Sequence, residues 1–165
     1  MIRSMTHDDI RQVQKIAQIS WQHTYNGIIP EEVQQKFLNM AYSDAMLQKR
    51  MEKTHMLLAE SDGTIVGFAA FTTTDEDGDA ELTAIYLLPE YQEMGIGTQL
   101  FQAGLELLED AHQLFVYVEC ANLKGRSFYE AKGFEFVEEF EELFEGYPLY
   151  TAQYVYYVKA PVFAG

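Results

Sequence analysis

A glycine-rich turn between an apolar strand and a helix is the feature that most limits how this chain can fold. The segment 87–100 reads LLPEYQEMGIGTQL, in which a strand ends near Pro89 and Gly95 and Gly97 lead into a helix. Turns that join a buried strand to a helix are typical of strand–helix–strand crossovers in α/β domains. The sequence therefore predicts a mixed α/β fold built around this turn.

Hydrophobic periodicity and turn residues divide the rest of the chain into strands and helices. Thr6 and Asp9 have the spacing of a capping box before a first helix. Asp62 and Gly63 predict a tight turn between two strands. We expect strands at residues 1–5, 55–61, 64–74, 80–88, 114–120, 135–140 and 149–159, and helices that follow Thr6 and cover residues 31–40, 43–52, 97–111 and 122–133.

No internal repeat or linker interrupts these elements, so they predict one domain over residues 1–165. We expect an α/β (α+β) fold with a mixed central sheet of about six to seven strands flanked by helices. The acidic segment 138–150 is expected to connect the last two strands. The aromatic final strand, YTAQYVYYVK, is a candidate for edge-to-edge pairing in a homodimer.

The composition is strongly acidic, with 26 Asp and Glu against 11 Lys and Arg and a net charge of −15. Such a field repels phosphate backbones and attracts amines, which argues against a nucleic-acid partner. The alternative is that the acidity only aids solubility. A single cysteine, no apolar run of roughly 20 residues and no apolar signal-peptide core predict a cytoplasmic protein without a membrane span.

The glycine turn has the chemistry of an anion site. Helix N-termini leave backbone amides unpaired and carry partial positive charge, and glycines let a phosphate approach those amides closely. Gln92 and Thr98 add side-chain donors. A Walker-type loop is excluded because G-x-x-x-x-G-K-[ST] is absent, and a dinucleotide fingerprint because Leu100 replaces its third glycine. The turn therefore predicts a pyrophosphate site, and a turn that merely packs tightly is the alternative.

The segment Gln92–Gly97 resembles the Q/R-x-x-G-x-G/A motif of the GCN5-related N-acetyltransferases, the GNAT superfamily. The preceding AELTAIYLLPEY is similar to the central strand of that family, and NLKGRSFYEAKGF is similar to its later helix. These three signals follow the family's order and cover roughly residues 80–134. The resemblance implies a single GNAT-like domain that transfers an acetyl group from acetyl-coenzyme A to an amine.

The resemblance also implies a site for coenzyme A along the turn and the central strand. Lys124 and Arg126 are the basic residues nearest the later helix in the sequence and are candidates for the 3′-phosphate. Glu93 and Met94 depart from the family pattern, because they lower the positive charge around the phosphates. The implied cofactor residues are Ile85, Tyr86 and Leu87 for the acetyl group and pantetheine, and Gln92, Glu93, Met94, Gly95, Ile96, Gly97 and Thr98 for the pyrophosphate.

Two catalytic roles follow from the same resemblance. Tyr129 matches a tyrosine that protonates the departing thiolate, and the alternative is a packing aromatic. Asn122 matches an asparagine near the cofactor, although a plain N-cap explains it equally well. Glu81 is the first candidate for the general base and Glu119 is the second, and a solvated carboxylate with ordered water as base is the alternative to both.

The acceptor site is expected beside the first helix, where Trp21, His23 and Tyr25 precede a loop. The acceptor is a small cationic amine such as a polyamine, or a peptide amine, attacked directly in a ternary complex. The alternative is a non-catalytic sensor or interaction module that binds coenzyme A. Scattered histidines predict no metal, and the lone Cys120 has no partner pattern for a nucleophile.

Overall fold

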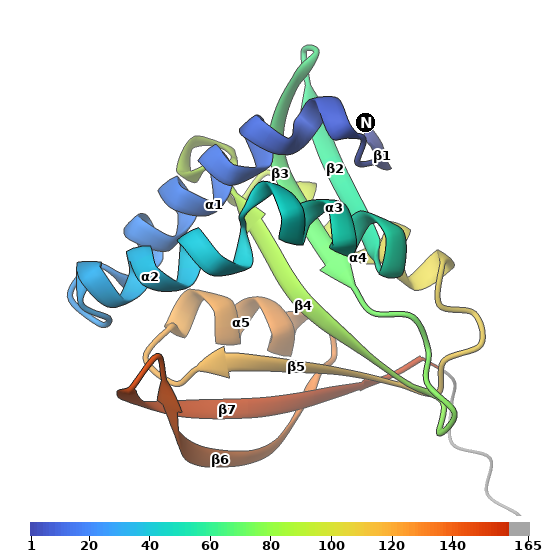
Figure 1. Cartoon of the computed structure of the whole chain (residues 1–165). Helices are drawn as coiled ribbons and strands as arrows, with labels where there is room; N and C mark the ends of the chain where they lie inside the picture. Colours follow the sequence, from blue (N-terminus) through green and yellow to red (C-terminus); the bar gives the residue numbers. More distant parts are fainter. Residues whose placement is uncertain (159–165) are drawn as a thin grey trace, which may run out of the picture.

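One mixed sheet of seven strands organises the protein, and helices cover both of its faces (Figure 1). The structure is a computed structural model that describes residues 1–158. Its elements are β1 (Ile2–Ser4), the 3₁₀ turn η1 (His7–Asp9), α1 (Ile10–Tyr25), α2 (Glu31–Ala41), α3 (Asp44–Lys53), β2 (His55–Ser61), β3 (Thr64–Phe71), β4 (Asp79–Leu87), η2 (Pro89–Tyr91), α4 (Ile96–Glu106), β5 (Gln113–Glu119), α5 (Leu123–Ala131), β6 (Glu135–Phe144) and β7 (Tyr147–Tyr157).

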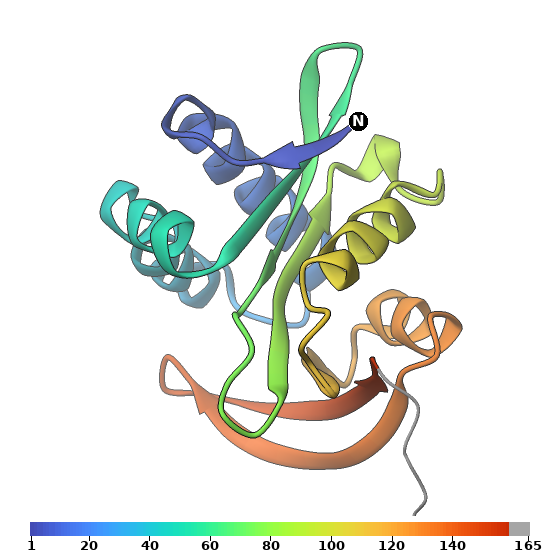
Figure 2. The same ribbon diagram turned by 90° about the vertical axis from the view of Figure 1, so that its right-hand side faces the viewer.

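The strand order is β1-β2-β3-β4-β5-β7-β6, and every neighbouring pair is antiparallel except β4 and β5. Figure 2 shows α1, α2 and α3 on one face of the sheet and α4 and α5 on the other. The mixed α/β fold and the sheet of up to seven strands are confirmed. Across residues 1–158, no helix has the length and apolar character that a bilayer span requires.

The two central strands, β4 and β5, are paired over only a short stretch. They pair over three residues only, from Asp79 opposite Gln113 to Glu81 opposite Phe115, and then diverge within the described chain (Figure 1). On the other side of β4, the register against β3 shifts at Thr83, which is therefore the extra residue of a β-bulge. A bulge bends a strand and strengthens its twist. The backbones of β4 and β5 thus diverge at the centre of the sheet, which leaves a gap in the hydrogen-bonded pairing between the two strands.

Two hydrophobic cores lie on opposite faces of this sheet. The first packs α1, α2 and α3 on residues such as Ile16, Leu47 and Phe68, and the second packs α4 and α5 on residues such as Phe71, Leu100, Phe101, Leu114 and Tyr154. Fully burying a side chain such as Leu or Phe contributes about 1.5–3 kcal/mol. Each face of the sheet is therefore stabilised by its own packed layer of helices.

The predicted capping box at the first helix is confirmed, with one addition. The Asp9 Oδ2 accepts a hydrogen bond from the Thr6 backbone N–H at 2.8 Å, and η1 forms before α1 begins at Ile10. Arg3 donates to both carboxylate oxygens of Asp9, at 2.8 and 2.9 Å, and to Glu60 at 2.6 Å. The hydrogen bonds from Arg3 lower the pKa of Asp9 to about 2 and tie β1, η1 and β2 together.

Two expectations about helix and strand limits were wrong. The helix expected over 97–111 ends at Glu106, and Leu107 is exposed whereas Leu108 and Ala111 are buried from the following turn. Burial in a connecting turn continues the apolar spacing of the helix, so the pattern overestimates its length. The segment 138–150 is strand rather than connection, because β6 continues to Phe144.

The β6–β7 hairpin also overturns the expected dimer edge. Glu145 and Gly146 have φ values of 49° and 80°, the left-handed pair that two-residue hairpin turns require. The final strand β7 lies between β5 and β6, so the segment 150–158 is not an edge, and Lys159 lies outside the described residues. The edge strand is β6, and its glutamates oppose pairing with a second copy.

Replacing Gly104 by Ala tests the packing of α4 on the sheet. A Cβ at Gly104 would collide with the ring of the fully buried Phe71. We expect the free energy of unfolding to fall by about 1–3 kcal/mol from overpacking, which exceeds the gain of about 1 kcal/mol in helix propensity. Urea denaturation measures the change. Gln102→Ala on the exposed side of α4 is the control, and equal stability of the two variants would contradict the packing.

Candidate active site

The glycine turn forms an open nest of backbone amides at the start of α4. Glu93 and Gly95 have φ values of 63° and 83°, and Gly95 is the N-cap of the helix. Gln99 is the first residue whose N–H bonds back to Gly95, so the N–H groups of the preceding turn have no partner within the helix. No atom lies within 4 Å of a Cβ built at Gly95. The turn therefore presents unpaired donors to open space, which suits a phosphate group.

Helix α5 supports this turn and brings a cation to it. A Cβ on Gly97 would lie 3.0 Å from the Phe128 ring, so a larger residue there would require the ring to shift. The Lys132 Nζ lies 5.6 Å from the centre of the same ring. Lys132 is not among the cofactor residues expected from the sequence, although its spacing of four residues from Phe128 places both on one helix face. Arg126 is engaged elsewhere, because it donates to Tyr154 Oη and to a backbone carbonyl.

The expected cofactor strand borders the gap in the sheet. Ile85, Tyr86 and Leu87 pair with β3 on one side of β4. On the side that faces β5, the described chain offers them no strand partner. Ser20 donates to the Leu87 carbonyl at 3.1 Å. Backbone groups along this edge are thus not paired with another strand of the described chain.

Three phenols from three elements lie close to one another at the gap. Tyr25 belongs to the core of α1–α3, whereas Tyr129 belongs to the core of α4 and α5. Burial raises the pKa of Tyr129, and the nearby Tyr25 raises it further. Burial also raises the pKa of Tyr86, to which Tyr25 and Tyr129 contribute. Since an unbroken sheet would separate the two layers, these phenols meet where β4 and β5 are unpaired.

These phenols are proton donors at neutral pH. Burial raises the pKa of Tyr25 to about 12, with Asn122 beside it acting in the opposite direction and Glu119 adding to the rise. The Asn122 Oδ1 accepts from the Gly125 N–H at 3.0 Å, which makes Asn122 the N-cap of α5.

The two candidate bases lie in different places. Glu81 is half-buried on the last paired rung of β4, and burial raises the pKa of its carboxyl. Tyr117 lies beside it, since Glu81 and then Glu138 add to the rise that burial causes in the pKa of that phenol. Glu119 stands four residues beyond the Glu81 partner Phe115, roughly 13 Å along β5. Its carboxylate accepts from the Ala121 N–H and lies near Tyr25.

Trp21 supports the acceptor side rather than facing it. Its ring stacks on Phe37 and Phe144 at 4.6 and 5.7 Å and touches Tyr25 at 4.6 Å. It is 6% exposed, and its Nε1 is the one fully buried side-chain polar atom of residues 1–158 that lacks a hydrogen bond. Trp21 and Tyr25 are both expected at the acceptor site from the sequence, and the Trp21 ring lies beside both Tyr25 and Tyr86.

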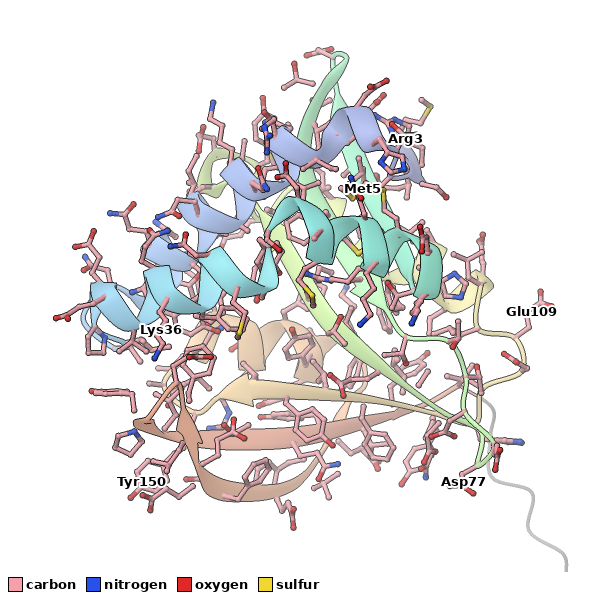
Figure 3. All side chains as sticks on the ribbon, viewed as in Figure 1. Arg3, Met5, Lys36, Asp77, Glu109 and Tyr150 are labelled. Atoms are coloured by element: carbon pink, nitrogen blue, oxygen red, sulfur yellow. The ribbon has the colours of Figure 1, made fainter. Side chains whose placement is uncertain are left out.

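The loop after Tyr25 approaches the β6–β7 hairpin. Lys36 of α2, labelled in Figure 3, reaches toward the hairpin and forms an ion pair with Glu145 at 3.7 Å. A pocket of about 270 Å³ lies between this loop and the start of β7. In residues 1–158, no group of three or more His, Cys, Asp or Glu side chains is arranged to hold a metal ion.

Comparison with known sequences points to one family. A model of the Acetyltransferase (GNAT) family matches residues 13–134. Spermidine N(1)-acetyltransferase of Thermoplasma acidophilum is 30% identical over 142 residues, which cover 81% of this chain and 87% of that protein. The uncharacterized N-acetyltransferase YuaI of Bacillus subtilis is 33% identical over 122 residues, which cover 71% and 70% of the two chains.

Solved structures agree with the sequences. PaiA N-acetyltransferase from Thermoplasma acidophilum, determined in complex with coenzyme A, matches with a TM-score of 0.80 and 27% identity over 94% of this chain and 98% of that one. A GCN5-related N-acetyltransferase from Rhodopseudomonas palustris shares the fold, with a TM-score of 0.81 and 21% identity over 95% and 94% of the chains. The chain therefore belongs to the GNAT family of acetyltransferases and is an acetyl-coenzyme A-dependent N-acetyltransferase.

Proposed function

We propose that the protein acetylates a primary amine of a small cationic molecule of the polyamine class, by direct attack in a ternary complex. The observation that carries this proposal is the charge of the strands beside the gap. β5, β6 and β7 contain six glutamates and no Lys, Arg or His. Such a surface attracts a polycation and repels an anionic acceptor. The similarity to a spermidine N(1)-acetyltransferase over 81% of the chain supports the same substrate class.

Acetyl-coenzyme A enters this proposal as the acetyl donor, held mainly by backbone groups. The amides of residues 95–98, with the Gln92 side chain, bind the pyrophosphate, and Lys132 supplies positive charge that Glu93 and Met94 do not. The free edge of β4 at residues 85–87 aligns the pantetheine arm and the thioester. Because these contacts are to the backbone, the acidic side chains of the turn do not remove them.

The residues at the gap divide the proton transfers between them. Glu81 takes a proton from the acceptor ammonium, directly or through a water, so that the neutral amine attacks the thioester carbonyl. A backbone N–H at the free edge of β4 stabilises the negative charge on the carbonyl oxygen. As the carbon–sulfur bond breaks, Tyr129 gives its proton to the departing thiolate of coenzyme A, and the attacking nitrogen loses its second proton to water, from which Tyr129 is reprotonated. Glu119 and Tyr25 contact the acceptor, and Trp21 fixes the ring of Tyr25.

An assay of thiol release over a panel of amines tests the proposed function. With acetyl-coenzyme A present, we expect spermidine and 1,4-diaminobutane to release thiol at kcat/KM values at least about tenfold above those of an alanine-terminated peptide or free lysine. The reason is that a second ammonium group gains from the acidic surface. A higher kcat/KM for the peptide would overturn the assignment of the substrate class.

Replacing Tyr129 by Phe tests the proposed acid. We expect kcat to fall about 10²–10³-fold, because a positioned acid contributes about that factor. The dissociation constant for coenzyme A should change less than twofold in calorimetric titration, since no contact to the cofactor backbone is lost. Tyr150→Phe removes a hydroxyl from an exposed ring of the hairpin and serves as the control. An unchanged kcat in Tyr129→Phe would show that the acid is another group.

The pH dependence of kcat/KM tests the proposed base. Burial raises the pKa of the Glu81 carboxyl above its ordinary value. A base works when deprotonated, so we expect kcat/KM to fall as the pH drops through this raised pKa, and Glu81→Gln to abolish that acid limb. The control is Glu139→Gln, which removes a carboxylate from β6, the edge strand of the sheet. If the acid limb survives in Glu81→Gln, an ordered water or another carboxylate removes the proton.

A further inference from the structure

The Trp21 Nε1–H is a buried donor without an acceptor in the described chain, and such groups are rare in folded proteins. The residue is 6% exposed, and its ring stacks on Phe37 and Phe144 at 4.6 and 5.7 Å between ring centres. The indole has no other polar atom, and its N–H only donates. A donor that is held this firmly and left unpaired calls for an acceptor close to it.

Tyr86 is the polar side chain beside this N–H. Ser20, the residue before Trp21, donates its hydroxyl to the carbonyl of Leu87, the residue after Tyr86, at 3.1 Å. This bond fixes α1 against β4 at the point where the Trp21 and Tyr86 rings lie side by side. Burial raises the pKa of the Tyr86 phenol, and the indole N–H acts in the opposite direction. The N–H of Trp21 therefore faces the Tyr86 Oη, just short of a complete hydrogen bond.

Tyr86 keeps accessible surface where β4 has lost its pairing with β5. Leu82 and Ala84 of β4 are buried, whereas residues 85–87 are each partly exposed. These three residues lie beyond Glu81, the last residue of β4 that pairs with β5, and they contact the packed layers on both faces of the sheet. Tyr86 is thus part of the aromatic layer under α1 and also borders the gap in the pairing, where the thioester is proposed to lie.

A hydrogen bond from Trp21 gives the Tyr86 hydroxyl a direction. If the phenol oxygen accepts from the indole, its own proton points away from Trp21. A phenol that accepts a hydrogen bond is also polarised, so its O–H becomes a stronger donor. Tyr25 and Tyr129 lie near Tyr86 and come from opposite layers, which places this hydroxyl at the gap rather than deep in one layer. The O–H is therefore suited to a carbonyl oxygen of a ligand at the gap.

We propose that the Tyr86 hydroxyl donates a hydrogen bond to the carbonyl oxygen of the acetyl thioester, and that the Trp21 Nε1–H holds the hydroxyl in that direction. The inference rests on the proposed function, which places the thioester along residues 85–87. When the amine attacks, the carbonyl oxygen gains the electron pair of the C=O π bond, and it returns this pair when the carbon–sulfur bond breaks. No proton leaves Tyr86. The hydroxyl is a second donor to the oxyanion beside the backbone N–H, and Trp21 is a positioning residue.

Difference infrared spectroscopy of bound acetyl-coenzyme A, labelled with ¹³C at the thioester carbonyl, tests the donor without any amine. A hydrogen bond weakens the C=O bond, so we expect a lower stretching frequency in the unaltered protein than in Tyr86→Phe. Tyr42→Phe is the matched control, because Tyr42 and Tyr86 both pack edge-on against Phe68, at 5.9 and 5.5 Å. The control should leave the frequency unchanged. An equal frequency in Tyr86→Phe and the unaltered protein would overturn the proposal.

A double-mutant cycle on kcat at saturating amine tests the positioning role of Trp21. We expect Tyr86→Phe to lower kcat about 10²-fold, and Trp21→Phe to lower it about tenfold. In the Tyr86→Phe protein, Trp21→Phe should lower kcat by less than about twofold more, because the hydroxyl that Trp21 positions is already absent. A loss of the same size in both backgrounds would show that Trp21 acts only through packing, and the positioning role would be overturned.

The infrared and kinetic measurements separate failure of this inference from failure of the proposed function. If no amine releases thiol but Tyr86→Phe raises the carbonyl frequency, the proposed function fails and the hydrogen bond to the thioester stands. If amines are acetylated and Tyr86→Phe leaves the frequency unchanged, the hydrogen bond is overturned and the proposed function stands.

Discussion

The loss of pairing between β4 and β5 after three rungs is the constraint on which the rest of the site depends. The bulge at Thr83 turns β4 away, so that Leu82 faces the α4–α5 core and Ala84 faces the α1–α3 core. Backbone groups left unpaired in a sheet are costly unless something satisfies them. In the proposed function, the pantetheine arm of coenzyme A meets that need as an added strand would.

The gap also lets two layers that a closed sheet would separate act on one another. Tyr25 arrives from α1 and Tyr129 from α5, and burial keeps both phenols protonated. The glycine turn stands at the same end of β4, and the approach of Gly97 to Phe128 couples the phosphate site to the helix that carries Tyr129. The proposed phosphate site and the proposed acid are therefore positioned by one helix pair.

Local chemistry was predictable from the sequence, and long-range pairing was not. The turn at Gly95 and Gly97, the Asn122 cap and the strand that carries Glu81 follow from short-range rules of glycine, capping and periodicity. The ends of β6 did not, because glutamates on both faces of that strand erase the alternation that marks a half-buried strand. The place of Lys132 beside the glycine turn was not predictable, because it depends on how α5 packs against the start of α4.

The acidity of the acceptor side poses a problem that the position of Glu81 resolves. Carboxylates that attract an ammonium group also stabilise its charged form, and so raise the cost of removing the proton before attack. A base exposed to water would be too weak to share that cost. Glu81 is half-buried and lacks an ion pair in the described chain, so burial raises its pKa and makes it a stronger base. In the proposed mechanism, exposed carboxylates thus concentrate the acceptor and the shielded Glu81 removes its proton, which requires the two kinds of glutamate to occupy different places on the sheet.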